Sequence, residues 1–262
     1  MAKFKKAKKL PVDNMFFGWQ MGSSKHGTRV FPDIYAFDEL PNLDCNTFVF
    51  KNVEGNVAIV DPGNGMSFDA LLDGLKKCDV AFNNVKWIIV THVHVDHVLG
   101  IYPALDYFTS RNIQPPEIIA LGESARVIEE ADVEKIFPGE LGLSPKQFGV
   151  NIKPMKVRSV KEGDQLNLGD LNLQVMECPG HAEGSMCLLD PQHKILISGD
   201  VIFSGGAFGR VDFPGGSVKK LLQSIDRLAK LDFDVLLPGH MNFSRAGRRE
   251  AQTALAIAKQ FF

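Results

Sequence analysis

The sequence predicts a fold in which β-strands alternate with α-helices (α/β), and three features support this prediction. Short apolar runs separated by Gly, Pro and Asn dominate residues 15–60, as in a series of strands joined by turns. Residues 67–77 then carry apolar side chains at helical spacing, and residues 85–90 form a β-branched run typical of a buried strand. A chain of 262 residues has room for one large α/β domain or two small ones.

The individual elements follow from the same patterns. In the N-terminal part, apolar runs bounded by turn residues predict four strands, at 15–21, 34–37, 45–50 and 56–60. Beyond the buried strand, the patterns predict a helix at 101–109, a strand at 117–120, a helix at 123–136, strands at 171–178 and 194–198, a helix at 217–230, a strand at 234–237 and a helix at 246–262. Residues 137–153 are rich in Gly and Pro and predict a long loop, which is either a lid over the functional site or a surface excursion without a role.

The charge distribution separates a basic N-terminal tail from an acidic body. The first nine residues contain five lysines, and Pro11 and Asp13 prevent a continuous apolar segment after them, so we expect residues 1–14 to form a flexible tail and residues 15–262 a single domain. Beyond those lysines the chain has 24 Lys and Arg residues against 31 Asp and Glu residues, which opposes binding to nucleic acid. No apolar stretch is long enough to span a membrane, so we expect no membrane contact.

The densest group of chemically active side chains is the stretch THVHVDH at residues 91–97. Its imidazoles and carboxylate, His92, His94, His97 and Asp96, are more polar groups than a core tolerates without partners. Imidazole and carboxylate are the usual ligands of zinc and non-haem iron. Because side chains alternate along an extended chain, we expect Asp96 on the same side as His92 and His94, with His97 turned elsewhere, so that one loop serves two neighbouring metals.

Three further ligand candidates lie at strand ends in the second half of the chain, namely His181, Asp200 and His240. A glycine precedes each of them, which allows the backbone to approach closely. One such residue alone is usually a structural cap, but together the candidates make five histidines and two carboxylates, enough for two metals. Asp61, at the end of an earlier strand, is either a turn residue or a carboxylate that orients a ligating imidazole.

Four motifs resemble the signature of the metallo-β-lactamase superfamily over about residues 45–240. They are THVHVDH at 91–97, PGH at 179–181, SGD at 198–200 and PGH at 238–240. Within this resemblance, GHAEGS at 180–185 and GRVDFPGGS at 209–217 are most similar to glyoxalase II and its hydrolase relatives. The resemblance implies an α+β fold, a four-layer αβ/βα sandwich of two mixed β-sheets flanked by helices.

The resemblance also implies which residues hold each metal. It places His92, His94 and His181 on one ion, Asp96, His97 and His240 on the other, and Asp200 between them as a bridge. The implied cofactors are two divalent metal ions per chain, with zinc as the first expectation and iron or manganese as the alternatives.

The chemistry expected of such a site is hydrolysis. Two divalent ions that share a bridging water lower its pKa, and the hydroxide attacks a carbonyl or phosphoryl centre while one ion polarises the oxygen that becomes negative. Asp96 and Asp200 are the expected catalytic residues, because they hold metal and also orient or accept the proton of the nucleophile. We therefore expect a hydrolase similar to hydroxyacylglutathione hydrolase, which cleaves a thioester or similar ester-like bond in a small-molecule substrate.

Four other functions stay open on the sequence. A persulfide dioxygenase would hold a single iron with His92, His181 and Asp200, and a lactonase would open an oxygen ester ring. An RNA-processing nuclease conflicts with the acidic body, and a non-catalytic metal-binding module conflicts with the open ligand sets. Only 22 residues follow His240, without the helical extension with which the larger glyoxalase II enzymes bind glutathione, and this weakens the implied recognition of glutathione.

Smaller features carry expectations of their own. The four cysteines are widely separated, which predicts free thiols in a reducing compartment and hence a cytoplasmic protein, with Cys178 as a small buried residue. Arg210 and Asp212 are expected to form an ion pair, or else to contact an anionic substrate. Phe261 and Phe262 at the C-terminus are expected to dock on the body or to be buried in a homodimer contact.

Overall fold

Two β-sheets form the centre of the molecule. The computed structural model describes residues 24–137 and 142–262. The first sheet has seven strands in chain order: β1 (Gly27–Phe31), β2 (Ile34–Phe37), β3 (Thr47–Lys51), β4 (Val57–Val60), β5 (Val85–Val90), β6 (Glu117–Leu121) and β7 (Arg158–Val160). The second sheet has five strands in the spatial order β12 (Val235–Pro238), β11 (Ile195–Gly199), β10 (Met186–Asp190), β9 (Leu171–Glu177) and β8 (Gln165–Leu168).

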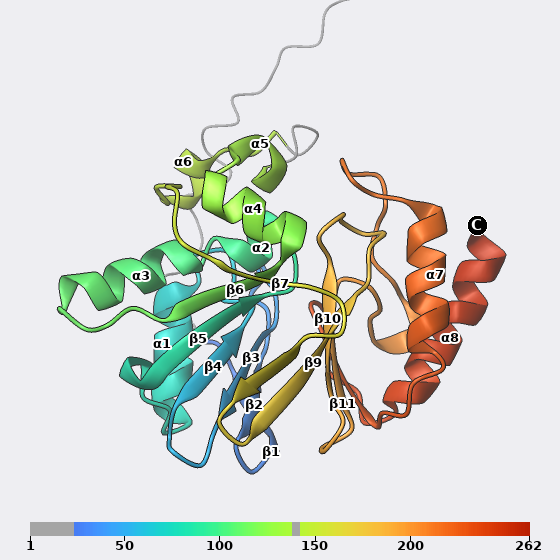
Figure 1. The fold of residues 1–262 in the computed structure, drawn as a ribbon, viewed down its shortest axis with the longest axis horizontal. Helices are drawn as coiled ribbons and strands as arrows, with labels where there is room; N and C mark the ends of the chain where they lie inside the picture. Colours follow the sequence, from blue (N-terminus) through green and yellow to red (C-terminus); the bar gives the residue numbers. More distant parts are fainter. Residues whose placement is uncertain (1–23, 138–141) are drawn as a thin grey trace, which may run out of the picture.

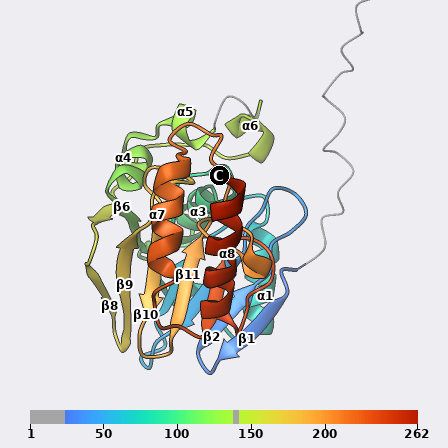
Figure 2. The same ribbon diagram turned by 90° about the vertical axis from the view of Figure 1, so that its right-hand side faces the viewer.

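Helices cover the outer face of each sheet, which gives four layers (Figure 1). Helices α1 (Phe68–Lys77) and α3 (Ile101–Ser110) lie on the first sheet. Helices α7 (Val218–Leu228) and α8 (Gly247–Phe261) lie side by side on the second sheet, as Figure 2 shows. Both sheets are mixed, because β4 to β7 run parallel in one and β11 and β12 run parallel in the other, while the remaining neighbours are antiparallel. The predicted four-layer sandwich of two mixed sheets is confirmed.

Alternating side chains along the central strands build the cores on the two faces of the first sheet. In β5, Ile88 and Val90 belong to the core beneath α1 and α3, whereas Ile89 belongs to the core between the sheets. In β3, Phe48 and Phe50 likewise face the second sheet. A central strand is covered on both faces, so it needs apolar residues at successive positions, and this is why the run at β5 predicted a buried strand.

The carboxyl ends of parallel strands bring the ligand candidates to one region. Asp61 directly follows β4, and Thr91 directly follows the neighbouring parallel strand β5. In the second sheet, Asp200 follows β11, and His240 comes two residues after its parallel neighbour β12. Because parallel neighbours end at the same edge of a sheet, the polar residues that follow them can meet there.

Two local predictions are wrong. The helix predicted at 123–136 is two helices, α4 (Gly122–Glu130) and α5 (Val133–Ile136), because Ala131 has a left-handed backbone with φ of 55° that ends α4. Asp96 does not continue the alternation of the preceding histidines, because it lies in the short helix α2 (Val95–Val98). In addition, β1, β7, β8 and β10 are strands that the sequence patterns did not indicate.

Some predictions fall outside the described residues. These are the flexible tail at 1–14, the strand at 15–21, and residues 138–141 of the loop predicted at 137–153. The described remainder of that loop contains α6 (Pro145–Phe148), and its role as a lid stays a prediction. Within residues 24–137 and 142–262, no helix is long and apolar enough to cross a membrane.

Candidate metal centre

All seven predicted ligand residues come together where loops from the two sheets meet. These loops follow the carboxyl ends of strands. They form three overlapping groups, in each of which the potential ligand atoms lie within 4.8 Å of one another. The groups are His92, His94 and His181; His92, His97 and Asp200; and Asp96, His97 and His240. The loop after β5 contributes to all three groups, so one loop does serve neighbouring positions.

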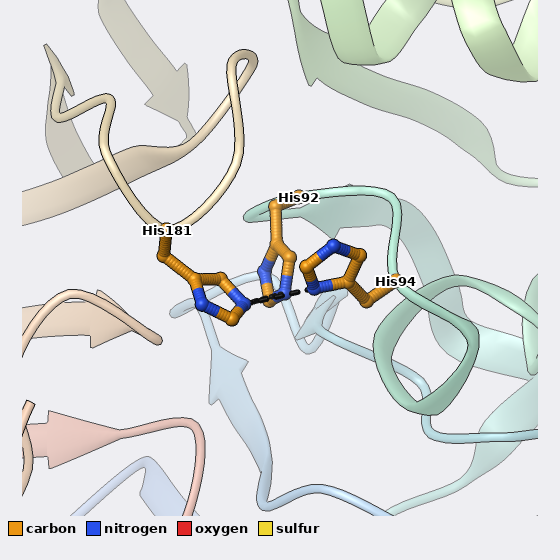
Figure 3. A group of neighbouring side chains, drawn as sticks. All are labelled: His92, His94 and His181. Atoms are coloured by element: carbon orange, nitrogen blue, oxygen red, sulfur yellow. Dashed lines mark hydrogen bonds between the residues drawn. The ribbon is translucent and has the colours of Figure 1, made fainter. Parts of the chain in front are cut away.

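The first group is a cluster of three imidazoles whose nitrogens point toward one another (Figure 3). His181 comes from the connection between β9 and β10, and His92 and His94 come from the loop after β5. The Nε2 atom of His181 lies 2.8 Å from Nδ1 of His94 and 3.2 Å from Nε2 of His92. Three nitrogens at such distances need either protons or a cation between them.

The hydrogen bonds of the ring nitrogens that point away from the centre show whether protons or a cation would lie between the rings. Nδ1 of His181 lies 2.8 Å from the carbonyl oxygen of Arg210, so Nδ1 carries the proton and Nε2 presents a lone pair. Nδ1 of His92 lies 3.1 Å from the hydroxyl of Thr91, which donates its own proton to Asp61, so Nδ1 of His92 is also the protonated nitrogen. Lone pairs therefore converge at the centre, as metal coordination requires.

Burial keeps His92 and His94 uncharged. Burial and the neighbouring histidines lower the pKa of His92 well below its usual value, and they lower the pKa of His94 to about 3. Both rings are neutral at physiological pH as a result. Neutral imidazole is the form that binds metal.

The third group, Asp96, His97 and His240, has a carboxylate behind each of its imidazoles. Nδ1 of His97 lies 2.9 Å from Oδ2 of Asp61, and Nδ1 of His240 lies 2.6 Å from Oε2 of Glu39. This carboxylate-to-imidazole contact fixes the orientation of a metal-ligating histidine and raises its basicity. The opposite nitrogen of His240 faces Oδ2 of Asp96 at 3.1 Å. Both imidazoles therefore direct Nε2 toward the centre.

Asp61 settles one question that the sequence left open. Its carboxylate accepts from the backbone N–H of Thr91 at 2.8 Å, from the hydroxyl of Thr91 at 2.7 Å and from His97. Asp61 is fully buried and has a left-handed backbone with φ of 53°. It therefore does orient a histidine of the cluster, and it also holds the start of the ligand loop.

Asp200 lies between the first and the third group. Its Oδ1 is 3.3 Å from Nε2 of His97, and its Oδ2 is 3.5 Å from Nε2 of His181 and 3.4 Å from Nε2 of His240. Among the described residues, Oδ1 of Asp200 and Nε2 of His97 are buried atoms without a hydrogen-bond partner. Buried polar atoms normally have partners, and a pair of cations on either side of Asp200 would supply them. The donor set thus fits two metal ions.

Two glycines make the close packing around Asp200 feasible. A Cβ atom on Gly239 would lie 2.2 Å from Oδ1 of Asp200, and a Cβ atom on Gly209 would lie 2.0 Å from the backbone oxygen of Asp200. Neither distance is tolerated between real atoms. Only glycine at these positions allows the two loops to approach Asp200 so closely.

Comparison with known proteins identifies the family. The model of the metallo-beta-lactamase superfamily matches residues 40–240. The chain belongs to the metallo-β-lactamase superfamily. In this superfamily member, the buried His and Asp groups have the composition expected of a dinuclear metal site.

Three relatives of this superfamily member are informative. Acyl-coenzyme A thioesterase MBLAC2 of Homo sapiens is 34% identical over 219 residues, which are 78% of this chain and 75% of the relative. Hydroxyacylglutathione hydrolase GloC of Haemophilus influenzae is 29% identical over 211 residues, which are 79% of this chain and 90% of the relative. The crystal structure of TTHA1623 in a di-iron-bound form is 28% identical and has a TM-score of 0.64, covering 82% of this chain and 96% of that protein.

The loop that follows Gly209 covers one side of the candidate metal centre. Arg210 and Asp212 form the expected ion pair, which lowers the pKa of Asp212 to about 2. The guanidinium of Arg210 lies 4.0 Å from the ring centre of Phe213, and that ring meets the edge of His94 at 5.5 Å between centres. Contact of Arg210 with an anionic substrate stays a prediction.

The sequence patterns missed Glu39, which lies 201 positions before its partner His240. No local signal marks Glu39, because its role exists only through tertiary contact. The prediction for Cys178 is confirmed, since this residue is fully buried with a free thiol, as are Cys45 and Cys187. Phe261 and Phe262 remain 78% and 47% exposed, and their rings contact one another and Phe208.

Proposed function

We propose that this protein is a dinuclear metal-dependent hydrolase that cleaves a thioester. The observation that carries the proposal is the position of Asp200, whose carboxylate lies within 3.5 Å of imidazole nitrogens from both ligand sets. Its Oδ2 faces His181 and His240, and its Oδ1 faces His97. His92, His94 and His181 would hold one ion, and Asp96, His97 and His240 the other. Zinc is the first expectation for both positions, and iron and manganese suit the same donors.

The chain's own residues prepare the reaction. When bound, two divalent ions supply Lewis acidity and lower the pKa of water toward neutrality. Burial opposes ionisation of Asp96, but His97 and His240 lower the pKa of Asp96, so it is a carboxylate at neutral pH. Its side chain is 19% exposed, against 8% for Asp200, so Asp96 is the carboxylate that can orient an incoming water and accept its proton.

Two relatives support a thioester as the substrate class. One is named as an acyl-coenzyme A thioesterase and the other as a hydroxyacylglutathione hydrolase, and the substrates in both names are thioesters. A thiolate is a good leaving group, so its departure needs no strong general acid. The site agrees with this requirement, because His92 and His94 are neutral there and Asp96 and Asp200 are ionised, so none of these four groups is a strong general acid.

A single-iron persulfide dioxygenase is the main alternative. Such an enzyme needs one complete set of ligands, whereas here the second set of Asp96, His97 and His240 is equally complete and each imidazole has a carboxylate behind it. That second set favours two ions, and the relative TTHA1623 holds two irons.

Metal analysis and a substrate panel test the proposal together. Protein purified without added metal is expected to contain about two divalent ions per chain and to hydrolyse acyl thioesters. Asp200→Ala is expected to lose this activity, and Asp190→Ala, which removes a buried carboxylate away from the site, is the matched control. One iron per chain with oxygen consumption on a persulfide, and without thioester hydrolysis, would overturn the proposal.

A further inference from the structure

We infer that the pocket beside Asp96 and His240 binds the apolar acyl group of the substrate, with Leu40, Pro41 and Leu43 as its contact surface. This inference rests on the proposed thioester hydrolysis and adds which part of the substrate is recognised and where. It predicts that the enzyme prefers apolar acyl chains of increasing length over short or polar ones.

The pocket opens directly onto the candidate metal centre. It has a volume of about 450 Å³, which is within the range of small-molecule sites. Asp96 and His240 form part of its wall, and the loop between β2 and β3 forms the rest with Glu39, Leu40, Pro41, Leu43 and Asp44. A group bound there would lie next to the atoms that act on the scissile bond.

Backbone strain marks the same place. Leu43 has φ of 55° and Met241 has φ of 66°, and within the described chain they are the large apolar residues with a left-handed backbone. A Cβ atom disfavours this conformation, so such residues persist only where the surrounding structure enforces them, and they concentrate at functional sites. The side chains of both are about half exposed, at 47% and 50%. Met241 directly follows His240, so both strained residues flank the same wall of the pocket.

Buried polar contacts enforce the strained backbone of Leu43. The side-chain amide of Asn64 donates to the carbonyl oxygens of Asn42 and Leu43, each at 2.7 Å. The next residue, Asp44, forms an ion pair of 2.8 Å with Lys25, and both side chains are fully buried. These contacts hold the buried side of the loop in place, so the side chain of Leu43 stays at the surface instead of folding into the core.

A second set of polar contacts holds Met241. The side-chain amide of Asn46 donates to the carbonyl oxygen of Met241 at 2.6 Å, and the backbone N–H of Met241 donates to Glu39 at 2.9 Å. Glu39 also contacts His240, so Glu39 supports both Met241 and the metal-ligand candidate. An apolar surface that is held rigidly before binding loses little entropy when a ligand arrives.

The charges of the pocket wall favour an acyl chain over an anionic thiol carrier. Among the described residues that line it, none is Lys or Arg, and the acidic ones are Glu39, Asp44 and Asp96. Glutathione carries carboxylates and coenzyme A carries phosphates, and the pocket wall offers neither carrier a Lys or Arg side chain to pair with. The apolar part of the substrate is the part that fits.

A chain-length series tests the inference with one small, uncharged thiol. The probes are the acetyl, butyryl, hexanoyl and octanoyl thioesters of N-acetylcysteamine, assayed with metal-loaded protein. Each methylene that becomes buried is expected to raise kcat/KM by about fourfold until the pocket is filled. In Leu43→Gly, the ratio of kcat/KM for the octanoyl to the acetyl probe is expected to fall by about tenfold.

Ala131→Gly is the matched control. Ala131 has the same φ of 55° at the end of α4 and does not line the pocket, so this variant relieves the same strain and is expected to keep the wild-type ratio. Glycine suits a left-handed backbone, so the Tm of Leu43→Gly is expected to stay within about 2 °C of wild type or to rise. Loss of the ratio in Leu43→Gly therefore cannot be attributed to unfolding.

Binding without turnover separates this inference from the proposed function. Calorimetry measures the Kd of two amide analogues of the octanoyl and acetyl probes, in which an N–H group replaces the thioester sulfur. These amides are not cleaved as thioesters are. If no thioester is hydrolysed but the octanoyl amide binds more tightly than the acetyl amide and Leu43→Gly removes the difference, the pocket stands and the proposed reaction fails. If chain length has no effect on kcat/KM or on Kd, or if Leu43→Gly and Ala131→Gly behave alike, the inference is overturned.

Discussion

Asp61→Asn is expected to lower the metal affinity of this protein while the chain still folds. In the native protein, Oδ1 of Asp61 accepts from the backbone of Thr91, while Oδ2 accepts from both the hydroxyl of Thr91 and Nδ1 of His97. Asparagine keeps the first contact but places an NH2 group where Oδ2 was. The hydroxyl can rotate and accept, whereas Nδ1 of His97 can accept only if its proton moves to Nε2. That proton would then occupy the nitrogen that faces Asp200 and the metal position.

The size of the effect can be worked out from these contacts. Disturbing the support of a ligating histidine lowers metal affinity by about 10-fold to 100-fold. Loss of a buried hydrogen bond to a charged acceptor lowers the free energy of unfolding of the metal-free protein by about 1–3 kcal/mol. Metal affinity is measured by competition with a chromophoric chelator, and stability by urea unfolding of metal-free protein.

Asp190→Asn is the control for this variant. Asp190 is also buried, and its Oδ2 lies 2.6 Å from Nδ1 of His193, which belongs to none of the metal-ligand groups. This variant is expected to lose stability without any change in metal affinity. If Asp61→Asn binds two ions as tightly as wild type, the tautomer argument for His97 is wrong.

Four further predictions concern the site and its support. Asp200→Ala is expected to lower kcat/KM for thioesters by about 100-fold or more and to reduce the metal content found by elemental analysis. Glu39→Gln is expected to weaken the ion held by His240 by about tenfold, so that dialysis removes one of two ions and leaves the other. Lys25→Met leaves Asp44 buried without its partner and is expected to cost about 3–5 kcal/mol in urea unfolding. Chelation of both ions is expected to lower the Tm by about 20 °C, because each ion at a thousandfold excess over its Kd stabilises by about 4 kcal/mol and two ions by about 8 kcal/mol; an unchanged Tm would argue against a metal centre.

The sequence by itself determined the class of fold and the ligand candidates. Buried strands produce continuous apolar runs, so β5 was predictable to the residue, and polar residues directly after such runs must lie at a sheet edge. His92, Asp200 and His240 all follow strands in this way, which is why they were identified before any contact was known. Their number and type also indicated metal, since imidazole and carboxylate together are metal ligands.

Only the tertiary structure decided which groups support those ligands. Glu39 reaches His240 across 201 positions, and no local pattern encodes a contact of that separation. The same holds for the left-handed backbone at Leu43 and at Ala131, because side chains with a Cβ adopt it only when surrounding contacts outweigh the local preference. Local sequence determines the periodicity and the ends of helices and strands. Hydrogen bonds between distant loops determine the histidine tautomers, the backbone strain and the shape of the pocket.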